Sequence, residues 1–372
     1  MAKNAKLKQT EIGEIPEGWE KSSIGNNIEL VYGDGLTTRE RKGGNIPVYG
    51  SNGIIGYHDK SLVQGPGIIV GRKGTVGQVT FSKTDFWPID TTYYVKTKKE
   101  NDILFWYYFL KTLNLTEMNS HSAVPGLNRD YVYEIKKLLP SFNEQKAIAK
   151  ILSDLDEKIE LNNQTNKTLE SMAQAIFKEW FIDFRFSGFR KTKFKNGLPG
   201  DWRIGKLEEL MEITSGKRPN KKSDIKDTEF NIPLYGASSV MGFVKEILYN
   251  EPIIIIGRVG THGIVQRIQP PSFPSDNTLA IISKFYEYIY QILCTIDYDI
   301  LNVGSTQPLI TQSSIKAYKI IIPSENVLIK YENISSQLYA KVKANNYENK
   351  YLSEIRDSLL PKLMSGKIRI PN

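Results

Sequence analysis

Two long stretches of the chain have the pattern of apolar and polar positions that is typical of paired helices. Residues 144–180 and 326–360 contain no glycine or proline, the residues that most often interrupt a helix. Within both stretches, apolar positions recur at steps of four and three, the heptad spacing of a coiled coil. The first seam consists of Ile148, Leu152, Leu155, Ile159, Asn162, Asn166, Leu169, Ala173 and Ile176. The second seam consists of Leu338, Val342, Asn345, Asn349 and Leu352, in the same phase 183 positions later.

Two asparagines interrupt the middle of each seam, Asn162 and Asn166 in the first and Asn345 and Asn349 in the second. A buried asparagine weakens a coiled coil but fixes its register, because its amide needs a hydrogen-bonding partner. We therefore expect the two helices to pair antiparallel, so that the asparagine pairs meet at the centre. The alternative is two separate amphipathic helices, each packed against its own domain.

The rest of the chain is one unit written twice. The heptapeptide GRKGTVG at 71–77 returns as GRVGTHG at 257–263, which is 186 positions later. The segment IPVYGSNG at 46–53 returns as IPLYGASS at 232–239 with the same offset. Further out the offset is 183, and Trp19 has a tryptophan counterpart at that distance. Self-similarity of this extent indicates a duplicated structural unit.

Each unit combines short β-rich runs with one aromatic-rich helical segment, at 103–115 and at 286–298. The predicted fold class is α+β, with two similar globular domains separated by two long antiparallel coiled-coil helices and an internal pseudo-two-fold repeat of about 183 residues. The predicted segments are a first domain with a polar N-terminal tail, a central helix, a second domain, and a C-terminal helix with its tail. Their boundaries are 1–143, 144–185, 186–325 and 326–372.

The length of the helices and the charge of the chain favour a nucleic-acid partner. A helix of about 40 residues is roughly 60 Å long, so the pair would hold two similar domains at a fixed distance. Major grooves on one face of a DNA duplex recur every ~34–36 Å, which suggests a split recognition site. The net charge of +8 and the isoelectric point near 9.1 also favour a polyanionic partner.

Cysteine use and hydropathy exclude several other classes of protein. Cys294 is the only cysteine, so no internal disulfide can form, which fits a reducing cytoplasm. No apolar run approaches the ~18 residues of a membrane helix. The basic start, MAKNAKLKQTEIG, lacks the apolar region of a secretory signal. We therefore expect a cytoplasmic protein.

No pattern of catalytic or metal-binding residues stands out. His58, His121 and His262 are scattered without metal-ligand spacing, and the glycine-rich phosphate-binding motifs are absent. Asp90 and Asp276 recur in matching Pro-x-Asp-x-Thr segments, where we expect each aspartate to cap a turn. The sequence therefore predicts neither a catalytic site nor a metal site.

The duplicated unit, the IPEGW opening and the paired GRxGTxG turns resemble the specificity subunit of type I restriction–modification enzymes. So do NEQKAIAKILSDLDEKIELNNQ at 143–164, ESMAQAIFKEWFIDF at 170–184 and the ending LLPKLMSGKIRI at 359–370. The resemblance extends from about residue 12 to residue 370. The combination of these segments is specific, although each short segment alone is not.

The resemblance implies two target-recognition domains, each of which reads one half of an asymmetric, bipartite double-stranded DNA site. It also implies that the long helices dock two methyltransferase subunits and that the complex recruits two restriction/motor subunits. The specificity subunit itself is then non-catalytic. The assembled complex would be an adenine-N6 DNA methyltransferase and an ATP-dependent endonuclease, with S-adenosylmethionine, ATP and Mg bound by the partner subunits.

Residues that recur in both halves suit a task common to both, so the glycine turns are unsuited to reading different bases. Arg72, Lys73 and Arg258 are candidates for contact with the DNA backbone, which positions a protein without reading sequence. The alternative is a purely structural turn whose glycines supply positive φ or close backbone approach. The GXXG loop of KH domains is a weaker parallel, because that loop joins helices rather than strands.

Base reading is expected where the two halves diverge in sequence and in length. These stretches are 33–45 against 216–231, and 119–130 against 302–312. Arginine and lysine suit guanine edges, asparagine suits adenine, and threonine suits the thymine methyl group or polar base atoms. The candidates are Thr37, Thr38, Arg39, Arg41, Lys42, Ser122, Asn128, Arg129, Lys217, Arg218, Asn220, Lys221, Lys222, Ser305, Thr306, Gln307 and Gln312.

A protein of another class is the rival interpretation. A non-catalytic scaffold or adaptor without DNA readout would use the duplicated fold only to hold two partners. A solitary methyltransferase or nuclease is disfavoured, because the motifs that such an enzyme requires are absent.

Overall fold

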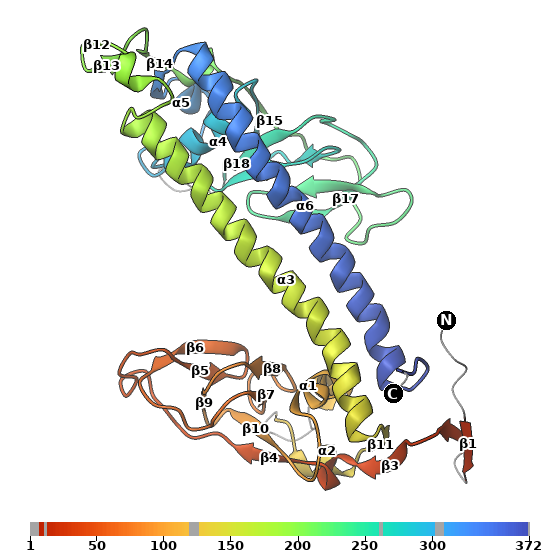
Figure 1. The fold of residues 1–372 in the computed structure, drawn as a ribbon. Helices are drawn as coiled ribbons and strands as arrows, with labels where there is room; N and C mark the ends of the chain where they lie inside the picture. Colours follow the sequence, from red (N-terminus) through yellow and green to blue (C-terminus); the bar gives the residue numbers. More distant parts are fainter. Residues whose placement is uncertain (1–6, 11–12, 119–125, 260–262, 302–308, 371–372) are drawn as a thin grey trace. The chain divides into compact units, whose positions relative to one another are not determined.

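The computed structural model describes residues 7–10, 13–118, 126–259, 263–301 and 309–370 (Figure 1). The chain forms two compact units, the first made of residues 1–162 and 346–372 and the second of residues 163–345. Each unit combines sheets and helices, so the predicted α+β class is confirmed. The boundaries of the four predicted segments differ from those of the two units, because each unit contains a part of both long helices. The four segments therefore stay a prediction.

The first unit has two sheets and two strand pairs. The larger sheet is antiparallel, in the order β4 (Ile28–Tyr32), β10 (Thr92–Thr97), β7 (Gly67–Gly71) and β8 (Val79–Ser82). The smaller sheet has the order β6 (Gly53–His58), β5 (Ile46–Gly50) and β9 (Trp87–Pro88), with β5 and β9 parallel. The strand pairs are β1 (Leu7–Thr10) with β2 (Gly13–Pro16), and β3 (Glu20–Ser23) with β11 (Lys136–Leu139).

The predicted aromatic helix of the first unit is α1 (Ile103–Lys111). Its start is fixed by Asp102, whose side chain accepts a hydrogen bond of 2.7 Å from the Phe105 amide. Buried aromatic and aliphatic side chains then anchor it in the core of this unit. The helix ends four residues before the predicted limit, where Thr112 bonds back to the Phe109 carbonyl. The other helices are η1 (Ile24–Asn26), η2 (Leu115–Met118) and α2 (Arg129–Glu134).

The second unit repeats this topology. Its larger sheet has the order β15 (Glu212–Ser215), β21 (Thr278–Ile282), β18 (Ile253–Gly257) and β19 (Val265–Ile268). Its smaller sheet has the order β17 (Val240–Val244), β16 (Ile232–Tyr235) and β20 (Phe273–Pro274), with β16 and β20 parallel. The strand pairs are β14 (Arg203–Lys206) with β22 (Lys319–Ile322), and β12 (Phe194–Lys195) with β13 (Leu198–Pro199). The helices are η3 (Lys178–Ile182), η4 (Phe189–Lys191), η5 (Leu207–Glu209), α4 (Tyr286–Thr295) and α5 (Gln312–Lys316).

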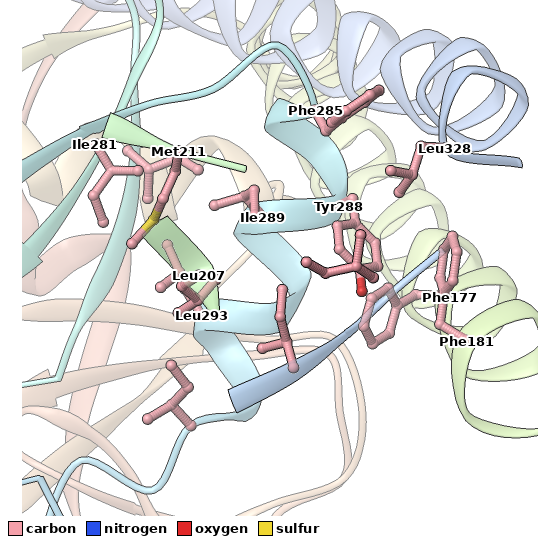
Figure 2. Packing of buried hydrophobic residues seen from close by; sticks show 14 of the residues in the cluster. Phe177, Phe181, Leu207, Met211, Ile281, Phe285, Tyr288, Ile289, Leu293 and Leu328 are labelled. Carbon is pink, nitrogen blue, oxygen red and sulfur yellow. The ribbon is translucent and has the colours of Figure 1, made fainter. Parts of the chain in front are cut away.

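The core of the second unit lies between its larger sheet, helix α4 and the long helices (Figure 2). Tyr288 and Leu293 of α4 are fully buried, and the ring of Tyr288 lies 4.7 Å from that of Phe181. Phe177, the last residue of the long helix α3 (Phe142–Phe177), also belongs to this cluster, and so do Leu328 and Tyr331 of the long helix α6 (Glu325–Met364). Burial of these apolar side chains attaches both long helices to the globular part of the unit.

The long helices are α3 (Phe142–Phe177) and α6 (Glu325–Met364). In the first unit Asp156 binds Arg356 and Asn162 binds Asn349. In the second unit Asn166 binds Asn345 and Ala173 packs against Tyr339. Residue numbers therefore fall along α6 as they rise along α3, and the predicted antiparallel pairing is confirmed.

The seam asparagines face one another. Asn162 Nδ2 donates to Asn349 Oδ1 at 2.9 Å within the first unit, and Asn345 Nδ2 donates to Asn166 Oδ1 at 2.8 Å within the second. Both bonds lie at the centre of the seam, where burial strengthens a polar contact. That these bonds set the register of the helices stays a prediction.

Helix α6 continues past its predicted end at residue 360, through Pro361 to Met364. Proline lacks the amide that would bond to the preceding turn, which costs a helix stability. Leu363 and Met364 are buried in the core of the first unit, and this burial offsets that cost.

The repeated glycine turn follows β7 and β18. A Cβ on Gly71 would lie 2.1 Å from the Thr75 carbonyl oxygen, and Gly74 and Gly77 have φ of +75° and +76°. Gly263 has a φ of +76° at the position that matches Gly77. The glycines are therefore required by the backbone, as the structural alternative states.

The expectation that Asp90 and Asp276 cap turns is wrong. In both units the threonine two residues later makes the bond, with Thr92 Oγ1 donating to the Ile89 carbonyl and Thr278 Oγ1 to the Ser275 carbonyl, each at 2.7 Å. Each threonine is buried beside the turn, whereas the side chains of Asp90 and Asp276 are exposed.

Candidate nucleic-acid interface

In the first unit, two arginines gather around one exposed aromatic ring. Tyr32 is 49% exposed, and the guanidinium carbons of Arg72 and Arg129 lie 5.1 and 4.9 Å from the centre of its ring. The opposing strand residue, Tyr93, is buried with its ring 5.0 Å from that of Tyr32. Burial raises the pKa of Tyr93, and its hydroxyl donates to the Leu127 carbonyl at 3.1 Å. A buried ring thus supports the exposed one.

Three elements bring these side chains together. Tyr32 is the last residue of β4, Arg72 follows β7, and Arg129 is the first residue of α2. The amide of Leu30 in β4 donates to the Tyr133 hydroxyl of α2 at 2.7 Å, which holds the helix against the strand.

The guanidinium of Arg72 is oriented by the backbone. Its Nε and Nη2 donate to the Asp90 carbonyl oxygen at 3.1 and 2.7 Å. Arg129 has a weaker constraint, one contact of 3.4 Å from Nη1 to the Leu30 carbonyl. Among the residues that the structure describes, neither arginine forms an ion pair with a carboxylate. Two arginines without carboxylate partners on an exposed ring make a surface suited to the phosphates and base edges of a nucleic acid.

The second unit builds the same junction from other side chains. Ser215 ends β15, Arg258 follows β18, and Gln312 begins α5. Ser215 Oγ accepts hydrogen bonds from Gln312 Nε2 at 2.9 Å and from Arg258 Nη1 at 3.4 Å. Nε of Arg258 is buried without a hydrogen-bond partner in the described part of the chain.

These two junctions occupy matching positions of the repeat. Tyr32 and Ser215 are 183 positions apart, as are Arg129 and Gln312, and both arginines follow the glycine-turn strand. The backbone connection is also shared. The Leu127 amide donates to the Arg72 carbonyl at 2.9 Å, and the matching Ile310 amide donates to the Arg258 carbonyl at 3.1 Å. Geometry is therefore conserved between the units, while two of the three side chains differ.

A glycine follows the strand at each junction. A Cβ on Gly33 would lie 2.3 Å from the Ile89 carbonyl oxygen, and one on Gly216 would lie 2.1 Å from the Ser275 carbonyl oxygen. Any side chain at these positions would displace the strand end. The two divergent loops, 33–45 and 216–231, therefore begin from equivalent fixed points.

Several candidates of the first loop serve the loop itself. The amide and hydroxyl of Thr37 both bond to Glu40, and these bonds lower the pKa of that carboxyl. Arg41 donates to the Ile55 and Leu36 carbonyls at 2.9 and 3.3 Å. Thr38, Arg39 and Lys42 are exposed. The exposed three are the better placed for DNA contact.

In the second loop, two candidates bind acidic side chains. Asn220 donates to Glu246 at 3.4 Å, and Lys222 lies 3.2 Å from Asp224. Lys217, Arg218 and Lys221 are exposed. Lys73, in the glycine turn of the first unit, is also exposed, and its amide donates to the Thr91 carbonyl.

The second pair of divergent stretches is described only in part. Asn128 caps α2, because its side chain accepts a bond of 2.8 Å from the Asp130 amide. Ser122, Ser305, Thr306 and Gln307 lie outside the described residues. Arg129 and Gln312 are thus the candidates of this stretch that the structure brings into the two junctions.

Tyr32 and Ser215 were not among the candidates from sequence. Each ends a strand and precedes the loop chosen as variable, so the choice of loop boundaries excluded them. One signal could have found them: they match in the repeat, differ in type, and directly precede Gly33 and Gly216. Repeat-matched positions that differ in chemistry are informative even inside regular structure.

The described residues hold no cluster of three or more potential metal ligands. None of the helices in the described ranges is long and apolar enough to cross a membrane. The pair of junctions is a polar feature that the two units share.

Comparison with known proteins gives one consistent result. The family described as "Type I restriction modification DNA specificity domain" matches residues 16–171 and again residues 199–353. The MjaIX specificity subunit of a type I restriction enzyme from Methanocaldococcus jannaschii is 27% identical, over 98% of this chain and 96% of that protein. The HindI specificity subunit from Haemophilus influenzae is 24% identical, over 76% of this chain and 82% of that protein.

A solved structure has the same fold. The crystal structure of a type I restriction–modification S subunit from M. genitalium matches with a TM-score of 0.68 and 20% sequence identity. The match covers 93% of this chain and 96% of that one. The duplicated architecture is therefore shared along nearly the whole chain.

Proposed function

The chain belongs to the type I restriction–modification DNA specificity family, and from that premise we propose how its two units divide the work. It is a specificity subunit with two target-recognition domains. Each domain reads one half of an asymmetric, bipartite double-stranded DNA site. The observation that carries this proposal is the pair of junctions, where one backbone geometry presents Tyr32 and Arg129 in one unit and Ser215 and Gln312 in the other.

The constant residues position the domains. Arg72 and Arg258 contact DNA phosphates, because a residue common to both units cannot distinguish two different half-sites. Lys73, whose counterpart in the second unit is Val259, adds a phosphate contact in the first unit alone. The backbone bonds of Arg72 to Asp90 support this role, since they orient the guanidinium and leave Nη1 for a phosphate oxygen. Substitution of Arg72 or Arg258 by alanine then weakens binding without changing the recognised sequence.

The long helices dock two methyltransferase subunits. Each unit exposes apolar side chains on these helices, among them Ile151 and Ile355 in the first unit and Ile334 and Met172 in the second. Ile151 and Ile334 are related by the offset of 183, as are Met172 and Ile355. A partner that binds one pair therefore fits the other, which supports a stoichiometry of two.

The helix proposal predicts a change of stoichiometry. Ile355→Asp should release one methyltransferase subunit and Met172→Asp the other, because a charge in an apolar contact is costly. Native mass spectrometry of the complex measures the subunit count. Glu354→Ala, at an exposed position beside Ile355, is the control and should leave the count at two. Loss of both subunits from either single variant would contradict two separate docking sites.

The chemistry belongs to the partner subunits in this proposal. The methyltransferase subunits bind S-adenosylmethionine and methylate adenine N6, and two restriction/motor subunits bind ATP and Mg. This chain is non-catalytic and supplies sequence recognition. Action on host DNA in the cytoplasm follows from that role.

A map of modified bases in host DNA tests the proposal, with the gene for this chain intact and deleted. We expect a split motif of two short half-sites to lose methylation on deletion, and complementation with the intact gene should restore it. An unchanged map, with the partner genes expressed, would contradict DNA readout by this chain and favour the scaffold or adaptor alternative.

A further inference from the structure

We propose that Arg129 and Gln312 read the equivalent base of the two half-sites, guanine in the first and adenine in the second, and that Tyr32 and Ser215 are the residues that position them. This inference rests on the proposed function, because it requires that both units bind DNA. It adds a specificity-determining pair of residues to each unit and an identity for one base of each half-site.

The geometry of the first unit suits a guanine. Tyr32 holds the Arg129 guanidinium over its ring, with 4.9 Å between the guanidinium carbon and the ring centre. The single 3.4 Å contact of Arg129 uses Nη1, so the edge formed by Nε and Nη2 has no partner among the described residues. Two parallel N–H donors on one edge match the O6 and N7 acceptors of guanine.

The geometry of the second unit suits an adenine. One N–H of the Gln312 amide is held by Ser215 Oγ at 2.9 Å. The amide keeps a second N–H and its carbonyl oxygen, a donor and an acceptor side by side. That pair matches N7 and the N6 amino group of adenine.

The positioning residue and the reading residue depend on each other. A serine at position 32 would offer no ring beneath the Arg129 guanidinium, and a glutamine at position 129 would lack the short serine side chain that holds Gln312 in the second unit. The residues that pair with them on the neighbouring strand also differ. Tyr32 pairs with the buried Tyr93, whose ring supports it, and Ser215 pairs with the buried Leu279. Specificity at this base is therefore a property of the pair, and one exchange alone does not transfer it.

The third member of each junction does not vary. Arg72 and Arg258 stand at the same place and their carbonyls accept the matching amides of Leu127 and Ile310. Because this arginine is the same in both units, it carries no information on which base is read. The junction thus joins one constant cation to one variable pair.

The experiment uses the full chain assembled with its methyltransferase subunits and a library of DNA duplexes randomised across both half-sites. The readout is the sequence preference of the methylated duplexes. The wild-type complex should prefer guanine at one position of one half-site and adenine at the counterpart of the other. The double variant Tyr32→Ser with Arg129→Gln should change the first preference from guanine to adenine by about tenfold, and leave the other half-site unchanged.

Single variants separate positioning from reading. Arg129→Gln alone should lose the guanine preference without gaining adenine. Tyr32→Ser alone should weaken the guanine preference. Tyr32→Phe should keep the wild-type preference, because the ring and not the hydroxyl holds the arginine. Glu29→Gln, at an exposed position of the same strand, is the control and should change neither half-site.

The outcomes are distinguishable. If the wild-type complex shows a bipartite preference and the assembled double variant keeps guanine at that position, the inference is overturned while the proposed function stands. Loss of methylation on every sequence by an assembled double variant also overturns it, because a reading pair changes the preferred base. If the wild-type complex shows no preference in either half-site, the proposed function itself fails.

Discussion

The two units attach their globular part to the long helices at matching positions but with different chemistry. In the first unit, the Tyr108 hydroxyl of α1 donates to Asp156 of α3 at 2.6 Å, and Arg356 binds the same carboxylate. In the second unit, Gln291 of α4 donates to the Tyr339 hydroxyl of α6 at 2.9 Å. Tyr108 and Gln291 are 183 positions apart, as are Asp156 and Tyr339.

The second unit has a buried ion pair at positions that are apolar in the first unit. Arg267 of β19 lies over the rings of Tyr286, Tyr290 and Tyr339, with its guanidinium carbon 3.6 Å from the centre of the Tyr339 ring. Glu287 pairs with Arg267 through both carboxylate oxygens, at 2.5 and 2.7 Å. The corresponding residues of the first unit include Phe81 and Leu104, which are apolar.

The difference teaches that the duplicated unit preserves where contacts occur and not what makes them. Where the globular part meets the long helices, the side chains of the two units differ, but a hydrogen bond connects the two parts in both units. At the junctions of Tyr32 and Ser215, the same freedom places different donors and acceptors at one geometric position. Divergence at constant geometry is thus compatible with stability in one region and supplies specificity in the other.

The largest expected effect is on the buried ion pair of the second unit. Arg267 and Glu287 have side chains only 18% and 7% exposed, so Arg267→Ala leaves an uncompensated buried carboxylate. We expect a loss of about 3–5 kcal/mol in the free energy of unfolding, measured by chemical denaturation. Lys284→Ala, which removes an exposed ion pair with Glu325, is the control and should have no measurable effect. An equally small effect of Arg267→Ala would contradict a stabilising role for the buried ion pair.

A smaller effect is expected at the joint of the first unit. Asp156→Ala removes the acceptor of two hydrogen bonds, from Tyr108 and from Arg356, at a partly exposed site. We expect the free energy of unfolding to fall by about 1–3 kcal/mol. Asp154→Ala, which removes an exposed partner of Lys150 on the same helix, should leave the denaturation midpoint unchanged. A larger loss than that of Arg267→Ala would reverse the order of the two joints.

The seam asparagines should behave as a coupled pair. Asn345→Leu removes the bond to Asn166, and we expect a loss of about 1 kcal/mol in the free energy of unfolding. The double variant with Asn166→Leu places apolar side chains at both facing positions and should recover most of that loss. A double-mutant cycle from denaturation curves measures the coupling, and simple additivity of the two losses would contradict the pairing.

A further expected effect concerns the pH dependence of the second unit. Burial raises the pKa of Glu332 to about 7, although the carboxylate accepts bonds from the Glu287 and Tyr288 amides, which lower it. The pKa of Glu332 in the folded protein lies above its ordinary value of 4.5, so the folded state favours the protonated carboxyl. Its contribution to the free energy of unfolding is therefore fully present below pH 4.5. That contribution is lost as the pH rises through about 7.

The matching variant is Glu332→Gln, which cannot ionise. Between pH 5 and pH 8, the wild type should lose about 1–2 kcal/mol more of its free energy of unfolding than the variant. Denaturation curves at several pH values measure the difference. Ala149 occupies the matching position of the first unit, so no such pH term is expected there. Parallel pH profiles for the wild type and the variant would contradict the role of Glu332.

Much of the architecture could be predicted from the sequence because its signals are local and repeated. The heptad seam, with its asparagines, led to an antiparallel helix pair, and the matching glycine turns located β7 and β18. The identity of a residue does not predict local structure where a contact with a distant part of the chain determines it. Helix α6 continues through Pro361, for example, because Leu363 is buried in the core of the first unit.

The candidate site was only partly predictable for the same reason. Arg129 lies 97 positions after Tyr32, and the packing of Tyr133 against β4 brings them together. No local pattern encodes that contact. Arg72, Arg129, Arg258 and Gln312 were chosen from the repeat, but their grouping around Tyr32 and Ser215 follows from the strand ends that sequence alone could not place.

The most direct test of the central claim, that each unit reads its own half-site, is a methylation map of host DNA with single variants of the two units. Arg129→Ala should relax one half of the split motif and leave the other half intact, and Gln312→Ala should do the reverse. If either variant relaxed both halves, or if both variants relaxed the same half, the division of recognition between the two units would be contradicted.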